Sequence, residues 1–305
     1  MVMLLIVRAI TLITGFGLIH WGLNLVSASP PSLWNQLYFS GETFFTLGYG
    51  EAVPRTQLSK VLAVVEAGTG FGFIAVVIGY LPVLYQLFSQ REAHVIQLDA
   101  RAGSPPSAVT LLSRHSSEAG RKALDRLLER WEEWCTEVVE SHLSYPMLSY
   151  YRSQHDNESW LSSVSAIMDT CALLLVGIRG TQSFQARMTF AAACLTVTEL
   201  GRIFQIAPRP LEDDRLPHEE FERMRRTLQE VDLTFDDDLA ETELASFRST
   251  YEPFVNGLAS YFVLPVPHGC RSQTRLIIGR RVRAGGLRNS SSKQCPINQN
   301  EERLD

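Results

Sequence analysis

Two apolar segments near the N-terminus limit what this chain can fold into more than any other feature. The first covers residues 2–26 with Arg8 as its single strong charge, and the second covers residues 61–88. A run of about 20 apolar residues is long enough to cross the hydrocarbon core of a bilayer. The sequence therefore predicts an outer membrane helix over residues 2–27 and an inner one over residues 57–89.

The composition of the whole chain hides these segments, because it averages two regions that meet different solvents. The chain has 305 residues, of which 45% are hydrophobic and 20% charged, with a formal net charge of −5. The part after residue 90 is charged, amphipathic and long enough to bury a core of its own. The small net charge gives no indication of nucleic acid as a partner.

A signal peptide is the alternative for the first apolar run. It is disfavoured because no small-residue cleavage site leads into a secreted domain and because a second apolar run follows. Met1 begins almost inside the run. We therefore expect the natural chain to carry more sequence upstream.

The residues between the two runs contain a short helical pattern and a glycine-rich pentapeptide. Residues 33–45 predict a helix that is too short to span the bilayer and must be buried in protein at membrane depth. The pentapeptide that follows it is Thr46-Leu47-Gly48-Tyr49-Gly50. Its glycines can adopt the left-handed backbone that lets successive carbonyls point at one axis, as a dehydrated cation requires.

This arrangement resembles the pore of potassium channels, whose usual filter is Thr-Val-Gly-Tyr-Gly followed by Asp. The resemblance implies potassium as the permeant ion and a homotetramer in membrane lipid, each chain supplying one loop. It also implies that Thr46 adds a ring of hydroxyl oxygens and that Tyr49 braces the loop against the pore helix. Leu47 and Glu51 depart from the usual valine and aspartate. The sequence indicates no cofactor, no metal beyond potassium in the filter and no enzyme activity.

Three residues beside the pentapeptide are candidates for supporting it: Glu42, Thr43 and Glu51. Related bacterial pores place a carboxylate behind the filter at the position of Glu42. One hypothesis is that Glu42 and Glu51 share a proton or a water and tune inactivation. The alternative is that Glu51 is a solvated charge that attracts cations to the pore mouth.

Three residues of the inner helix are candidates for gating or for the cavity: Glu66, Gly70 and Pro82. An ionisable residue inside a span is a functional candidate, so Glu66 either lines the cavity or lies behind the pore helix, neutral or bonded to Thr43 or to the backbone. Pro82 removes a backbone donor and favours a kink. The family's inner helix tends to bend near Gly70, and bending there is the expected gating movement.

The orientation follows from the resemblance. The Gly50 end of the filter faces outside and both termini face the cytoplasm, which gives a multi-pass protein of the inner (plasma) membrane. Arg8, Arg91 and Arg101 on the inner flanks agree with this orientation. His20, near the outer end of the first span, belongs either to an interfacial anchor or to a pH sensor.

The rest of the chain is predicted to be all-helical, which makes the fold class an all-α membrane protein. The predicted parts are a pore domain (1–90), a linker (91–107), a helical cytosolic domain (108–264) and a disordered tail (265–305). Within the helical domain, helices are predicted at residues 108–114, 119–143, 160–178, 181–201, 217–231 and 239–262.

Two alternatives stay open for the helical domain. Residues 160–178 are nearly long enough for a third span, although Asp169 and several serines favour a buried helix. His142, His155 and Asp156 could ligate a metal or form an enzyme site. Their spacing matches no familiar metal pattern, and no nucleophile or phosphate motif accompanies them.

Residues 30 to 180 also resemble bacterial proteins grouped as a potassium channel family. The segments that carry this resemblance are Glu66–Phe73, Gly79–Tyr85, Asp99–Pro106, Glu140–Pro146 and Arg152–His155. The resemblance implies no ligand for the helical domain, so the gating stimulus and a cytosolic regulator stay open. A non-conducting membrane sensor or scaffold that retains the pore fold is the alternative function.

Overall fold

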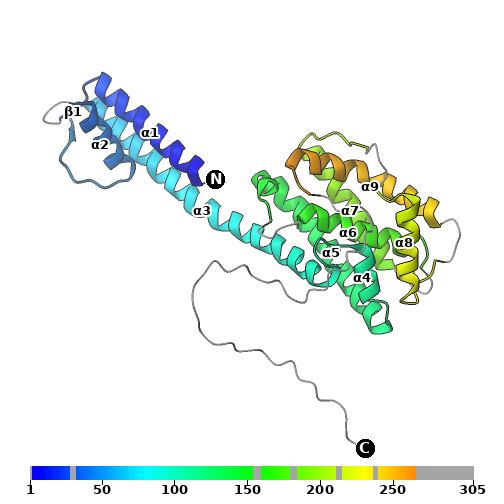
Figure 1. Ribbon diagram of the computed structural model, residues 1–305. Helices are drawn as coiled ribbons and strands as arrows, with labels where there is room; N and C mark the ends of the chain where they lie inside the picture. Colours follow the sequence, from blue (N-terminus) through cyan, green and yellow to red (C-terminus); the bar gives the residue numbers. More distant parts are fainter. Residues whose placement is uncertain are drawn as a thin grey trace, which may run out of the picture. The chain divides into compact units, whose positions relative to one another are not determined.

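The computed structural model describes residues 2–27, 32–153, 159–178, 184–210, 215–235 and 240–265. Nearly all of the predicted tail (265–305), and both His155 and Asp156, lie outside these ranges. Within them the regular secondary structure is helical apart from one short strand pair and an isolated bridge (Figure 1). The predicted all-α class is therefore confirmed.

The N-terminal module consists of three helices. They are α1 (Val2–Gly22), α2 (Leu33–Phe44) and the first half of α3 (Gln57–Ala102). The short helix α2 packs against both α1 and α3 (Figure 1). Both α1 and α3 are long and apolar enough to cross a membrane, and many of their large apolar side chains are exposed. Such a continuous apolar surface marks contact with lipid or with other chains.

Side-chain caps determine where α2 and α3 begin. The Oγ of Ser32 accepts the N–H of Asn35 at 3.2 Å at the start of α2. At the start of α3, Thr56 and Ser59 form a capping box, in which each side chain accepts the backbone N–H of the other, at 3.1 and 2.8 Å. These bonds satisfy N–H groups that have no partner inside the helix.

A short antiparallel strand pair accompanies the helices of the N-terminal module. β1 (Val26–Ser27) pairs with β2 (Val53–Pro54), and the Arg55 N–H donates to the Leu25 carbonyl at 2.9 Å. Backbone N–H and C=O groups beyond the end of a helix or in a loop need hydrogen-bond partners. Here the segment after α1 and the segment before α3 supply them to each other. The pair joins the end of α1 to the segment that follows residues 46–50.

α3 is longer than the sequence analysis predicts. The predicted helix ends at residue 89 and is followed by a linker, whereas α3 continues to Ala102. The physical reason is burial: Val95, Leu98 and Ala102 belong to the core of the helical domain, and tertiary packing of an apolar face supplies most helical stability. Gly103, with φ of +85°, then ends the helix.

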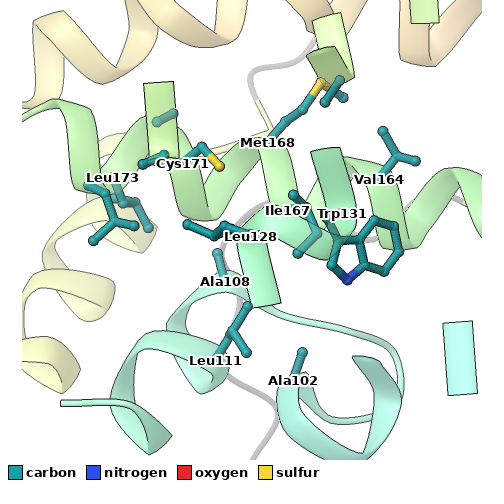
Figure 2. Packing of buried hydrophobic residues seen from close by; sticks show 14 of the residues in the cluster. Ala102, Ala108, Leu111, Leu128, Trp131, Val164, Ile167, Met168, Cys171 and Leu173 are labelled. Atoms are coloured by element: carbon teal, nitrogen blue, oxygen red, sulfur yellow. The ribbon is translucent and has the colours of Figure 1, made fainter. Parts of the chain in front are cut away.

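The helical domain is built from the following elements. They are α4 (Ala108–Arg114), α5 (Glu118–Ser144), the 3₁₀ helix η1 (Pro146–Tyr150), α6 (Trp160–Leu175), α7 (Phe184–Ile203), α8 (His218–Gln229) and α9 (Ala240–Phe262). Figure 2 shows Ile167 of α6 between Leu128 and Trp131 of α5. Every residue from Trp160 to Leu174 is buried. Burial in protein therefore explains the apolar character of α6 without a third span.

Asp169, the charged residue of α6, lies in a buried polar network. It accepts the hydroxyl of Tyr251, and its other oxygen lies 3.6 Å from Arg215 Nη2. Arg215 and Arg248 both contact Oε1 of Glu252, at 3.2 and 2.8 Å. Burial, and then the charge of Asp169, raise the pKa of the Tyr251 hydroxyl well above its usual value. The network thus pairs each buried charge with an opposite one.

Candidate pore and selectivity filter

The backbone of residues 46–50 alternates in handedness. The φ angle is +56° at Thr46, +68° at Gly48 and +80° at Gly50, whereas Leu47 and Tyr49 have no positive φ. Such alternation turns successive carbonyl oxygens toward the same side of the chain. The left-handed backbone predicted at Gly48 and Gly50 is observed. The positive φ of Thr46 was not predicted from the sequence, because a β-branched residue rarely adopts positive φ.

The pentapeptide begins directly at the C-terminal end of α2. The N–H of Phe45 donates to the Gly41 carbonyl at 3.0 Å, and that of Thr46 donates to the Thr43 carbonyl at 3.1 Å. The N–H of Leu47 donates to the Glu42 carbonyl at 2.8 Å. The last carbonyls of the pore helix thus hold the first residues of the loop. Thr43 contributes to this support through its backbone.

Glu42 fixes the far end of the loop. Its side chain is buried, and Oε1 accepts the N–H of Gly50 at 3.0 Å. Its Oε2 has no hydrogen-bond partner among the described residues. Glu51 is exposed. The structure therefore gives Glu42 a partner that the sequence did not predict, and a shared proton or water between Glu42 and Glu51 stays a prediction.

A cavity of about 300 Å³ lies between the loop, α2 and α3. It is lined by Phe39, Glu42, Thr43, Thr46, Gly48, Gly50, Ala52 and Ala67. Leu47 and Tyr49 do not line it and are 52% and 66% exposed in the single chain. The expected bracing of the loop by Tyr49 is therefore absent within one described chain.

Glu66 lies behind the pore helix and does not line an open cavity. Its side chain has no exposed surface, and its Oε2 lies 3.0 Å from Nε2 of His20 on α1. Its Oε1 is bonded to the hydroxyl of Ser40 on α2. The prediction of Thr43 as a partner of Glu66 is therefore wrong. His20, which the sequence analysis placed near the outer end of the first span, is fully buried, and its ring lies edge-on to Phe39.

This His20–Ser40–Glu66 cluster joins all three helices of the N-terminal module. Sequence reasoning considered His20 and Glu66 separately and did not consider Ser40. A signal was available, because a polar side chain inside an apolar helix needs a partner. His20 and Glu66 are ionisable residues within the two spans, and Nε2 of His20 and Oε2 of Glu66 partner each other, whereas Nδ1 of His20 has no hydrogen-bond partner among the described residues.

Gly70 lies at a close contact between α3 and the end of α2. A Cβ atom at Gly70 would lie 1.9 Å from the carbonyl oxygen of Phe44. On α1, a Cβ atom at Gly17 would lie 2.6 Å from Cδ2 of Leu37 of α2. Small residues let membrane helices approach closely, so both glycines make room for the pore helix. Bending at Gly70, and a kink at Pro82 within α3, stay predictions.

The described residues give no support to the alternative of a metal or enzyme site. They contain no group of three or more His, Cys, Asp or Glu side chains that could hold a metal ion. His142 is fully buried, and its Nδ1 donates to the Val138 carbonyl at 2.7 Å. A buried imidazole that is bonded to its own helix has a structural explanation.

Comparison with known families defines the class of this protein. Residues 3–86 match the model of a family described as ion channel. The matched part covers α1, α2, the pentapeptide and the first half of α3, which are the elements that form the site above. This match and the two long apolar helices indicate a membrane protein whose N-terminal module is similar to an ion channel family.

One curated relative extends the likeness beyond the pore module. The "Uncharacterized membrane protein YdjJ" of Bacillus subtilis (strain 168) is 25% identical over 161 residues. The aligned part is 52% of this chain and 46% of the relative, so this chain spans less than half of that protein's length. No solved structure gives a significant match.

Proposed function

We propose that this chain is one subunit of a potassium-selective channel that conducts potassium passively through the loop Thr46–Gly50. The observation that carries the proposal is the alternating backbone of this loop, with φ of +56° at Thr46, +68° at Gly48 and +80° at Gly50. Rings of carbonyl oxygens from several such loops replace the water shell of a potassium ion. Glu42, which accepts the Gly50 N–H, holds the loop in this shape.

An exposed stripe of uncharged, mostly small residues on α3 supports a homotetramer around a central axis. Its positions recur at alternating spacings of four and three residues, which places them on one helix face. They are Val61, Val65, Gly68, Gly72, Ala75, Gly79, Pro82, Gln86, Ser89, Ala93, Ile96 and Ala100, and all are exposed in the single chain. Glu66 and Gly70 lie off this stripe, against α1 and α2. We infer that the stripe faces the pore and the other subunits.

We propose that the protein lies in the inner (plasma) membrane, with Gly50 toward the outside and both termini in the cytoplasm. The apolar exposed side chains of α1, such as Met3 and Ile10, then face lipid. The helical domain lies on the cytoplasmic side, where a regulator of still unknown chemistry would reach it.

Potassium and sodium flux from liposomes that contain the purified protein tests this proposal. Wild type should pass potassium far better than sodium. Gly48→Ala should abolish selective flux, because a residue with a Cβ strains a backbone with φ of +68°. Gly15→Ala is the control, since a Cβ there meets no atom within 4 Å. A folded tetramer that passes no potassium would overturn the proposal and favour a non-conducting sensor or scaffold.

A further inference from the structure

The part of α3 that extends beyond the length needed to cross a bilayer is held by a segment of the helical domain. Roughly 50 Å of helix separates Gln57 from Arg91, at 1.5 Å per residue, which exceeds the hydrocarbon thickness of about 30 Å. Residues 145–153, which contain η1, pack on α3 at this level. We call residues 145–153 the collar.

The collar makes an apolar contact with α3. Leu148 of the collar forms one buried cluster with Leu84 and Phe88 of α3. Two aromatic pairs flank this cluster: Tyr145 lies 5.4 Å from Tyr80, and Tyr151 lies 5.8 Å from Phe88, between ring centroids. Tyrosines are typical of the membrane–water boundary, which agrees with the height of the collar along α3.

Arg91 ties the same stretch of α3 to the backbone of the collar. Its Nη1 donates to the carbonyl of Leu148 at 2.9 Å, and its Nη2 donates to that of Tyr151 at 2.7 Å. These carbonyls lie at the C-terminal end of η1, where the helix dipole favours a cation. Arg91 is only 4% exposed, so these bonds form away from water.

Glu92 completes the attachment. Its Oε1 accepts from Nη2 of Arg91 at 3.2 Å, and its Oε2 accepts the hydroxyl of Ser153 at 2.5 Å. The side chain is 6% exposed. Every charged atom of this pair therefore has a partner, as a buried pair requires. Residues on α3 and on the collar share the contact, which links the position of one segment to that of the other.

Packing against α5 is looser at this level. A cavity of about 330 Å³ lies between α3 and α5, lined on the α3 side by Leu87, Gln90 and Arg91. Trp134 and Val138 line it from α5. The hydrogen bonds that hold Arg91 and Glu92 to other elements therefore go to the collar.

We propose that Arg91 and Glu92 are positioning residues that fasten the pore-lining helix to the collar and so transmit the state of the helical domain to the pore. This inference rests on the proposed channel function. The pore module contains neither the collar nor the pair, so ion selectivity is set elsewhere. The pair governs how often the pore is open, and the filter governs which ion passes.

Single-channel recording of the full chain in planar bilayers tests the proposal. Ser153→Ala and Glu92→Ala should each shift the open probability at least about threefold, the scale of coupling by residues outside a site. The potassium-to-sodium permeability ratio should stay unchanged. The double variant should shift the open probability no further than Glu92→Ala alone, because Glu92→Ala already removes the acceptor of the Ser153 hydroxyl. Lys122→Gln, which alters an exposed pair with Glu118, is the control and should have no effect.

A second measurement separates this inference from the channel proposal. In hydrogen exchange of the full chain in detergent, Ser153→Ala should reduce protection of residues 84–92 and of the collar together, whether or not the protein conducts. Unchanged open probability in a conducting protein would overturn the inference. Unchanged hydrogen exchange at residues 84–92 would overturn this inference, whether or not the wild type conducts. A wild-type protein that passes no ion would by itself overturn only the channel proposal.

Discussion

Nε2 of His20 lies 3.0 Å from Oε2 of Glu66, and neither side chain has any exposed surface. The contact joins α1 to α3, and Ser40 of α2 binds the other oxygen of Glu66. Removing one member of a buried pair leaves its partner uncompensated and costs about 3–5 kcal/mol, whereas replacing both by apolar groups costs less. This cluster therefore holds the pore helix between the two spans.

The first prediction concerns this pair. Glu66→Leu and His20→Phe should each lower the thermal stability of the detergent-solubilised protein, and the double variant should be more stable than the sum of the two losses implies. Thermal unfolding followed by circular dichroism measures this. If the two losses of stability are additive, the side chains of His20 and Glu66 do not interact. If Glu66→Leu changes the conductance but leaves the stability intact, Glu66 lines the cavity instead.

The bond from the Gly50 N–H to Glu42 predicts how the proposed filter responds to substitution. Glu42→Ala removes the acceptor, and a hydrogen bond to a charged group is worth roughly 1.5–3 kcal/mol, so the conducting filter should become about tenfold less populated. Glu42→Gln keeps an acceptor oxygen and should have a smaller effect. Inactivation measured in bilayer recordings tests this.

Glu51 is the matched control for Glu42. If the Gly50 bond is what matters, Glu51→Gln should leave inactivation nearly unchanged. Equal effects of Glu42→Gln and Glu51→Gln would instead favour a proton or water shared between the two carboxylates.

Gly70 predicts a steric effect in addition to any hinge. Gly70→Ala places a Cβ 1.9 Å from the Phe44 carbonyl oxygen, and overpacking of this kind costs typically about 1–3 kcal/mol or more. The variant should lose thermal stability, whereas Gly15→Ala, which meets open space, should not. A Gly70→Ala protein of normal stability with altered gating would show that the glycine acts as a hinge alone.

The sequence predicted the parts of the molecule that follow from local pattern. The spans, the short helix at residues 33–45 and the glycine positions of the filter rest on apolar periodicity and on backbone chemistry, which neighbouring residues decide. The pairing of His20 with Glu66 could not be read in the same way, because it depends on how α1 and α3 lie against each other. The extension of α3 to Ala102 was missed for the same reason, since its cause is the core of the helical domain.

The network around Asp169 predicts the stability of the helical domain. Asp169→Ala leaves Arg215 near a single remaining carboxylate, Glu252, and removes the acceptor of the Tyr251 hydroxyl. The expected loss is about 3–5 kcal/mol. Denaturant unfolding of the full chain, followed by tryptophan fluorescence, measures it. Glu118→Ala, which breaks an exposed pair with Lys122, should cost less than about 1 kcal/mol, and an equally small loss for Asp169→Ala would contradict the role of the network.

His142 predicts how stability depends on pH. Burial, followed by the positive charge of Arg91, lowers the pKa of His142 to about 4, against an ordinary value near 6.5. As the pH falls, His142 is therefore protonated in the unfolded chain before it is protonated in the folded protein. The contribution of neutral His142 to the free energy of unfolding is complete above about pH 6.5. It decreases by roughly 3 kcal/mol between about pH 6.5 and 4.

Thermal unfolding of wild type and His142→Gln at pH 7.5 and pH 5 tests this prediction, and the variant should show the smaller decrease in melting temperature on acidification. His218 is the matched comparison of opposite sign. It is exposed and lies 2.9 Å from Glu241, whose hydrogen bond raises the pKa of His218. Its stabilisation is present at low pH and is lost as the pH rises through its folded pKa, so His218→Gln should enlarge the acid-induced decrease. Identical pH dependence in wild type and His142→Gln would mean that the imidazole of His142 is solvated in the folded protein.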